Sequence, residues 1–190
     1  GEMGKRAEPE ANETRESRQW ECETQKGERR QAGDEELARA FVPHLRYDRA
    51  EPFALQGIGY TLFRDSSGEA GGVSGKSPSC RRVLETPAGG CVIEYAFYYD
   101  FDIQHLYDLE HAFVYLDKDG KIAGVESSFH GKFLNSRIEG VTEYEGSHPV
   151  LYVQPGKHAL LPAPEYFRLV IDRDTACGKN AGRDGFLISD

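Results

Sequence analysis

The spacing of hydrophobic and polar residues predicts one helix followed by many short strands. The stretch GDEELARAFVPHL has helical spacing, with Asp34 as a candidate N-cap and Pro43 as its stop. We expect the buried face of this helix to consist of Leu37, Ala40 and Phe41.

After this helix the spacing changes to a period of two, which is typical of strands. DKDG lies between two alternating runs and predicts a hairpin turn rather than a calcium loop, because the later oxygen ligands of such a loop are missing. Many short strands predict a mainly β fold, an antiparallel, jelly-roll-like β-sandwich with a short N-terminal helical appendage. The predicted strands lie in GIGYTLFR (57–64), CVIEYAFYYDFD (91–102), EHAFVYLDKDGKIAGVESSF (110–129), HPVLYVQPG (148–156) and EYFRLVID (165–172).

Composition predicts a charged N-terminal arm, partly helical, over residues 1–33 and a β-sandwich domain over residues 34–190. Residues 65–78 are rich in Gly and Ser and predict a surface loop. Within this segment, AGGVSGKS fits the loose phosphate-loop formula. However, Pro78 stands where a helix should continue and no βαβ unit surrounds it, so nucleotide binding is excluded.

A net charge of −9 argues against nucleic acid as a partner, because an acidic surface repels phosphate. No apolar run is long enough for a transmembrane segment. Four cysteines without CxxC spacing permit two disulfides, Cys80–Cys91 and Cys22–Cys177, or four buried thiols. The disulfide alternative predicts a secreted or cell-surface protein, and the thiol alternative predicts a cytoplasmic one.

The candidate chemistry is concentrated in DFDIQHLYDLEH, which starts at Asp100. His105, Asp108 and Glu110 form H-x-x-D-x-E, and in an extended chain the two acids project to the same side. Carboxylates beside an apolar strand require a neutralising charge, so these three residues are candidate ligands of a divalent cation. Oxygen ligands favour Mg²⁺ or Ca²⁺, with Mn²⁺ or Zn²⁺ as alternatives. The alternative interpretation is two exposed turn acids beside a structural histidine.

Two later histidines, His130 and His158, stand at predicted strand ends and are candidate acid/base groups or further ligands. His111 follows Glu110 and should point to the opposite face, where we expect a structural role. Tyr98 and Tyr107 are candidates for lining a pocket. The stripe Tyr95, Phe97 and Tyr99 is expected to be a buried strand face.

Four segments in the same order resemble the vacuolar protein sorting-associated protein 62 family: LARAFVPHLRYDRAEPF, HLYDLEHAFVYLDKDG, SSFHGK and HPVLYVQPGKHA. The H-x-x-D-x-E core is also similar to that of the Nep-like necrosis-inducing proteins, whose β-sandwich holds a divalent cation. The resemblance implies cation ligands at His105, Asp108 and Glu110, with Asp100 or Asp102 as a fourth. It departs from the family at Leu109, where Trp is usual, and it implies no cytolytic activity.

Two functions are compatible with these patterns. One is a cation-binding recognition module for a small-molecule or carbohydrate-like ligand. The other is a metal-dependent hydrolase or lyase that uses a cation-activated water, with His130 or His158 as the acid/base. No nucleophile or substrate is identifiable, which favours the binding module.

Overall fold

The computed structural model describes residues 32–49, 51–64, 73–103 and 105–169. The chain divides into two compact units, Gly1–Leu37 and Ala38–Asp190. In the first unit the described residues, 32–37, are helical. The strands that the structure describes belong to the second unit, and the boundary expected after residue 33 stays a prediction.

The predicted helix extends over residues 32–41 and ends before Pro43. Asp34 lies inside it instead of capping it, because the backbone is already helical at residue 32. Ala38 is its buried residue, at 3% exposure, whereas Leu37, Ala40 and Phe41 are only partly buried. Within the second unit, the hydroxyl of Tyr95 donates to the carbonyl of Ala38 at 2.7 Å, which attaches helical residues 38–41 to the core of that unit.

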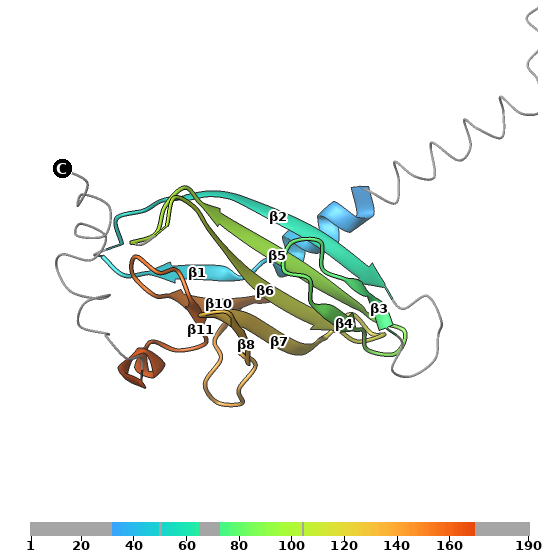
Figure 1. Cartoon of the computed structure of the whole chain (residues 1–190). Coiled ribbons are helices and arrows are strands. Elements are labelled where there is room, and N and C mark those ends of the chain that lie inside the picture. Colours follow the sequence, from blue (N-terminus) through green and yellow to red (C-terminus); the bar gives the residue numbers. More distant parts are fainter. Residues whose placement is uncertain (1–31, 50, 65–72, 104, 170–190) are drawn as a thin grey trace, which may run out of the picture. The chain divides into compact units, whose positions relative to one another are not determined.

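A five-stranded antiparallel sheet forms the centre of the second unit (Figure 1). Its order is β2-β5-β6-β7-β8. The strands are β2 (Leu55–Arg64), β5 (Cys91–Tyr99), β6 (Asp108–Leu116), β7 (Ile122–Phe129) and β8 (Lys132–Asn135). The DKDG hairpin is confirmed between β6 and β7, where the Asp117 carboxylate accepts the backbone N–H groups of Asp119 and Lys121, each at 2.9 Å.

A smaller sheet packs against one face of the central sheet and makes the fold a β-sandwich, as predicted. Its pairing is antiparallel except between β1 and β10, which run parallel. Ser127 on β7 connects the two sheets, since its buried hydroxyl donates to the carbonyl of Leu160 at 3.0 Å. The strands are β1 (His44–Tyr47), β9 (Tyr144–Glu145), β10 (His148–Val153) and β11 (Leu160–Leu161).

The expected aromatic stripe on β5 forms the core between these sheets. Tyr95, Phe97 and Tyr99 are at most 1% exposed. A second apolar cluster lies on the opposite face of the central sheet and consists of Phe63, Leu84, Val92 and Phe113.

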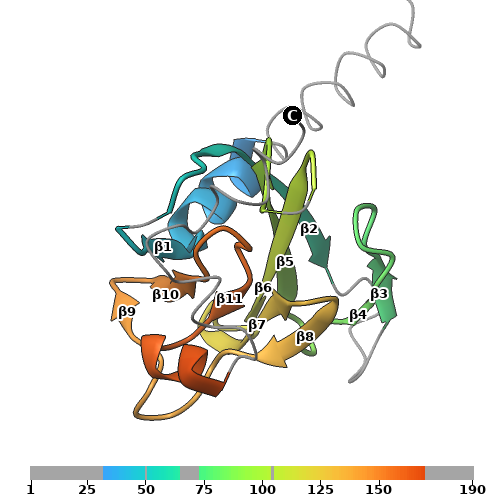
Figure 2. The same ribbon diagram turned by 60° about the vertical axis from the view of Figure 1, so that its left-hand side comes forward.

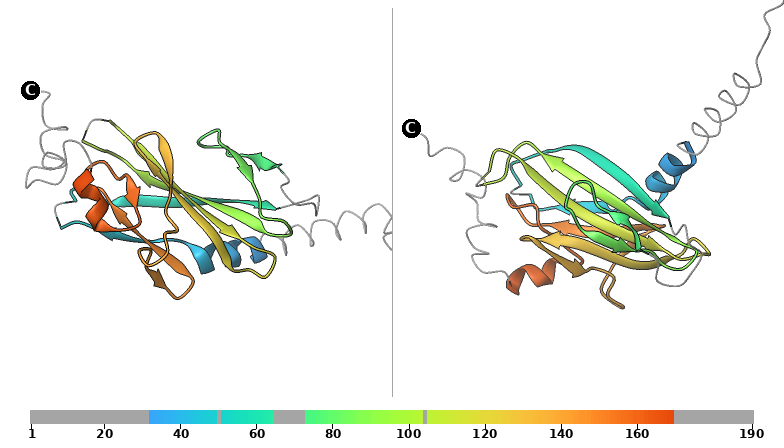
Figure 3. Two further views of the ribbon diagram at one scale, coloured as in Figure 1. Left: turned by 90° about the horizontal axis from the view of Figure 1, so that it is seen from below. Right: turned by 45° about the vertical axis from the view of Figure 1, so that its right-hand side comes forward.

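A two-stranded ribbon of β3 (Val73–Lys76) and β4 (Val83–Glu85) covers that second cluster. Figures 2 and 3 show the ribbon on the opposite side of β5 and β6 from β1, β10 and β11. The surface-loop prediction for residues 65–78 was therefore wrong for β3, because pairing with β4 satisfies its backbone. Residues 65–72 lie outside the described part of the chain.

The strand predicted at EYFRLVID was also wrong over residues 165–169, because Pro164–Leu169 form the 3₁₀ helix η1, and residues 170–172 lie outside the described part of the chain. Pro164 favours a helical start, and Glu165 lies in the first turn. Tyr166, Phe167 and Leu169 fit helical spacing as well as alternation, so the period could not distinguish the two structures.

Candidate functional site

Three segments that are distant in sequence meet at one end of the sandwich (Figure 1). The β5–β6 loop contacts the β10–β11 loop through Ile103, whose N–H donates to the carbonyl of Gly156 at 2.9 Å. The N–H of Gly156 donates in turn to the Glu51 carboxylate at 2.8 Å, and Glu51 belongs to the segment between β1 and β2. The segment that contains the motif at 105–110 therefore lies beside Gly156 from the β10–β11 loop, which in turn contacts Glu51 from the β1–β2 segment.

His158 lies at the centre of this meeting point and is fully buried. Its Nδ1 is 2.9 Å from Asp108 Oδ2, and its Nε2 is 3.2 Å from Glu51 Oε1. The ring stacks on Tyr99 with centroids 3.7 Å apart and planes at 2°. Burial lowers the pKa of His158, but the hydrogen bonds to Asp108 and Glu51 outweigh it and raise this pKa to about 9. The imidazole is therefore a cation at neutral pH.

Glu110 is another buried ionisable group at this end, at 9% exposure. The hydroxyl of Ser128 donates to its carboxylate. Burial raises the pKa of Glu110 to about 8, and the negative charges of Asp108 and Asp102 add to the rise, while Ser128 and His158 oppose it. Glu110 therefore retains a proton near neutral pH.

Asp102 connects His105 to these groups. Its carboxylate accepts the backbone N–H of His105 at 2.5 Å and lies 2.9 Å from the Nδ1 of the same residue. Lys157 Nζ donates to the same carboxylate at 3.3 Å. Asp102 is buried, whereas the His105 side chain is 65% exposed. His105 is thus connected to the buried end of the sandwich through Asp102.

We call Glu51, Asp102, Asp108 and Glu110, together with His158, the acidic centre. It contains four carboxylates, of which Glu51 and Asp102 have side chains only 5% and 4% exposed. Lys157 and the protonated His158 supply two positive charges. The four acids therefore outnumber the two basic groups that contact them. Carboxylate oxygens are the ligands that Mg²⁺ and Ca²⁺ prefer.

The other predicted residues are Asp100 and Tyr107 in the β5–β6 loop, Tyr98 on β5, and His130 after β7. The hydroxyl of Tyr98 hydrogen-bonds to Asp100, which places that acid beside an exposed tyrosine. Tyr107 is 66% exposed. His130 is exposed, and its Nε2 lies 2.8 Å from Gln154 Oε1.

Two residues of this region, Glu51 and Lys157, were not predicted. Glu51 lies within the EPF segment that resembles the vacuolar family, so this segment carried a signal for it. Lys157 also lies within a resembling segment, HPVLYVQPGKHA, but its contact with Asp102, 55 residues away, cannot be read from the sequence.

A second cluster lies on the opposite face of the central sheet. One ligand atom each from Cys80, Glu94 and His111 gathers within 4.8 Å of the others. Burial lowers the pKa of His111, although Glu94 opposes the shift, so this imidazole is neutral at pH 7. His111 lies on the face opposite to Glu110, as expected, but among potential metal ligands. The missed signal was Glu94, a carboxylate between Ile93 and Tyr95 in an otherwise apolar strand.

The expected disulfide between Cys80 and Cys91 is not formed, and both are free thiols. Cys80 Sγ instead lies 3.1 Å from the Ser77 hydroxyl, and Cys91 is buried on β5. Cys22 and Cys177 lie outside the described residues.

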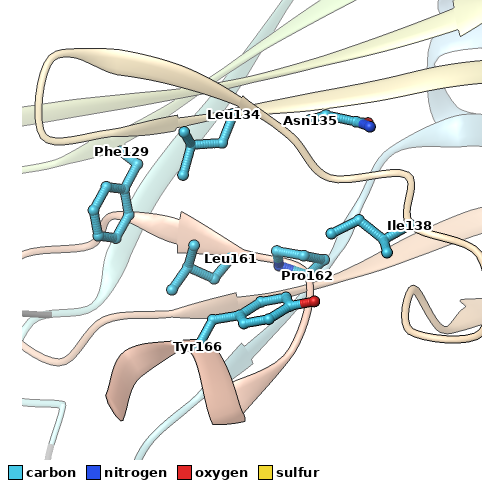
Figure 4. A pocket seen from close by; sticks show the side chains of 7 residues that line it. All are labelled: Phe129, Leu134, Asn135, Ile138, Leu161, Pro162 and Tyr166. Carbon is cyan, nitrogen blue, oxygen red and sulfur yellow. The ribbon is translucent and has the colours of Figure 1, made fainter. Parts of the chain in front are cut away.

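An apolar pocket of about 350 Å³ opens beside η1 and β11 (Figure 4). It is lined by Phe129, Leu134, Asn135, Ile138, Leu161, Pro162 and Tyr166. Few hydrogen-bonding groups line it, so it does not suit a sugar. Neither Tyr98 nor Tyr107 belongs to it.

Among the described helices none is both long and apolar enough to cross a membrane. No protein-family model matches the chain, and no curated protein matches it. Several solved structures match the chain.

Necrosis and ethylene inducing protein 2, from the causal agent of cocoa's witches' broom disease, is 25% identical with a TM-score of 0.40. The match covers 65% of this chain and 66% of that protein, so the chain spans just under two thirds of its length. NLPPya in complex with glucosamine is 20% identical with a TM-score of 0.36, and the match covers 68% of this chain and 71% of that one. NLPPya in complex with mannosamine is 21% identical with a TM-score of 0.39, covering 68% and 73%. The chain is therefore similar to solved Nep-like proteins, while its resemblance to the vacuolar family stays a prediction.

Proposed function

We propose that this protein is a recognition module that depends on a divalent cation held at the acidic centre. The observation that supports it best is the convergence of four carboxylates from three separate segments around the buried His158. Bringing so many acids together out of water is unfavourable unless positive charge accompanies them.

The proposed ligands are Asp102, Asp108 and Glu110, with the exposed His105 at the rim. Carboxylate oxygens from these three acids match the preference of Mg²⁺ or Ca²⁺, and His105 would admit Mn²⁺ or Zn²⁺. In the absence of a metal, the proton on Glu110 and the charges of Lys157 and His158 partly neutralise the centre. Cation binding then displaces that proton.

A role for His158 as acid/base is less well supported than a positioning role. Both of its ring nitrogens contact carboxylates, and the ring is fully buried against Tyr99. His158 therefore holds Asp108 and Glu51 in place. This arrangement favours the binding module over a hydrolase or lyase.

The proposed ligand is a small hydroxylated molecule, such as a sugar, that reaches the cation from the exposed His105 side. Its hydroxyl oxygens would complete the coordination of the metal. Tyr107, which is exposed in the same loop, is a candidate contact for the apolar face of such a ligand.

Metal analysis of the untreated purified protein, beside a His105→Ala variant, tests the cation site. We expect a bound divalent ion in the wild type and a clearly lower content in the variant. Equal metal content and equal thermal stability would refute the assignment. Titration with glucosamine, with and without the metal, then tests recognition, for which we expect metal-dependent binding.

A further inference from the structure

Cys80, Glu94 and His111, which we call the Cys80 cluster, lie between the β3–β4 ribbon and the central sheet. Glu94 is on β5, and His111 is on β6 directly opposite Ala96, so Glu94 and His111 are neighbours on one face of the central sheet. Cys80 comes from the turn between β3 and β4. Figure 2 shows the β3–β4 ribbon beside the central sheet, and Leu84 of β4 packs on that face with Phe63, Val92 and Phe113.

The distances within the cluster are close to those of a metal site. Glu94 Oε1 lies 3.8 Å from His111 Nε2 and 3.9 Å from Cys80 Sγ. Ligands of a tetrahedral zinc ion lie roughly 3.3–3.8 Å from one another, given bonds of about 2.0–2.3 Å. Small side-chain movements would therefore bring the three atoms onto one ion.

An independent observation comes from Glu94, which is only 2% exposed. Its Oε1 accepts the hydroxyls of Ser77 at 2.5 Å and Ser79 at 2.7 Å. Its Oε2 is buried and has no hydrogen-bond partner among the described residues. Buried carboxylate oxygens are normally satisfied, so Glu94 has an unused acceptor besides Oε1, the oxygen that lies near Cys80 and His111.

Space for a further ligand exists next to this group. A cavity of about 150 Å³ is lined by Glu94, Ser79, Pro78 and the β2 residues Gly59, Tyr60 and Thr61. The Ser79 hydroxyl lies 2.8 Å from His111 Nε2, so either this hydroxyl or a water in the cavity can take the fourth position.

We propose that Cys80, Glu94 and His111 bind a transition-metal ion, with Zn²⁺ as the best match. One sulfur, one nitrogen and one carboxylate oxygen form a donor set that suits zinc and discriminates against Mg²⁺ and Ca²⁺. The ion attaches the β3–β4 ribbon to the central sheet. It is independent of the cation proposed at the acidic centre, which lies on the other face of β6.

Co²⁺ is the probe that tests this site, because a cobalt–thiolate bond gives a charge-transfer band in the near ultraviolet. The test uses the full chain with Cys22, Cys91 and Cys177 replaced by Ala, so that Cys80 is the sole thiol. We expect the band to appear with Co²⁺ and to be displaced by Zn²⁺. In this background, Cys80→Ser should abolish the band and weaken Zn²⁺ binding at least tenfold.

The cobalt–thiolate band reports the Cys80 site alone, and two further variants separate metal binding there from loss of folding. Glu94→Gln should weaken the displacement of Co²⁺ by Zn²⁺, while Asp119→Asn, an exposed acid outside both candidate sites, should leave the band and its displacement by Zn²⁺ unchanged. Circular dichroism confirms that each variant is folded. The proposal is overturned if the folded sole-thiol protein shows no band, or if Cys80→Ser binds Zn²⁺ as tightly as its parent.

Discussion

Glu110 and His111 are consecutive residues of β6, and their side chains belong to two different polar groups on opposite faces of the central sheet. Glu110 contacts Ser128 and feels the charges of Asp108 and Asp102, while His111 contacts Ser79 and lies beside Glu94. Strand alternation alone produces this separation. A single strand therefore contributes to two candidate metal sites that can be perturbed one at a time.

The metal-free protein should lose stability as the pH rises. Folded Glu110 keeps its proton up to about pH 8, against 4.5 as its ordinary value, so the folded state binds more protons between these values. The protonated His158 acts in the same direction, since its stabilisation is complete below 6.5 and is lost as the pH rises through about 9. Each group contributes a slope of up to about 1.4 kcal/mol per pH unit.

Urea unfolding in the presence of a chelator, repeated from about pH 5 to pH 9, measures this dependence. The matched control is Glu110→Gln, which lacks the titrating group but keeps the shape. We expect the stability of the wild type relative to this variant to fall with pH across the interval. A constant difference would show that Glu110 has an ordinary pKa.

Loss of His158 should be costly, because its ring links Asp108 to Glu51 and stacks on Tyr99. His158→Ala leaves two carboxylates without their partner and is expected to lower the free energy of unfolding by about 3 kcal/mol. The exposed His130 offers a comparison, since it also has a positive φ, and its replacement by Ala should cost less than about 1 kcal/mol. Similar losses in both variants would contradict the central position of His158.

The buried hydroxyl of Ser127 should stabilise the contact between the two sheets. It donates to the carbonyl of Leu160 and lies 2.6 Å from the Ser136 hydroxyl. Ser127→Ala removes the donor and leaves a buried carbonyl unsatisfied, at an expected cost of about 1–3 kcal/mol. Chemical denaturation gives the value, and an unchanged midpoint would show that this hydrogen bond is dispensable.

Cys80 and Cys91 should both react as thiols. Alkylation in denaturant without reductant, followed by peptide mass spectrometry, is expected to find each of them singly modified. A pair of peptides linked through Cys80 and Cys91 would contradict this prediction and would show that the disulfide forms. The same experiment reports the states of Cys22 and Cys177.

The strands were predictable because their side chains alternate, and this alternation within a few residues shows which side chains face the core. The hairpin at Asp117 and the buried stripe on β5 follow from this pattern directly. The helical η1 was missed because its apolar spacing fits both periods. The strand β3 was missed because its partner β4, rather than its own composition, makes it a strand.

The candidate sites were only partly predictable, because their members come from different parts of the chain. His105, Asp108 and Glu110 could be named since they are close in sequence. Glu51 contacts His158, which is 107 residues away in the sequence, and no local pattern predicts that contact. Cys80 and Glu94 likewise meet only once the β3–β4 ribbon is placed over the sheet.

The most direct test of the acidic centre is calorimetric titration of chelator-treated protein with Ca²⁺ and with Mg²⁺, ions that the Cys80 cluster does not favour. We expect a single binding event that releases a proton near neutral pH, at least tenfold weaker in Asp108→Asn and unchanged in Asp119→Asn, an exposed acid outside the centre. Absence of binding to the folded wild type, or equal affinity in Asp108→Asn, would contradict the proposed cation site.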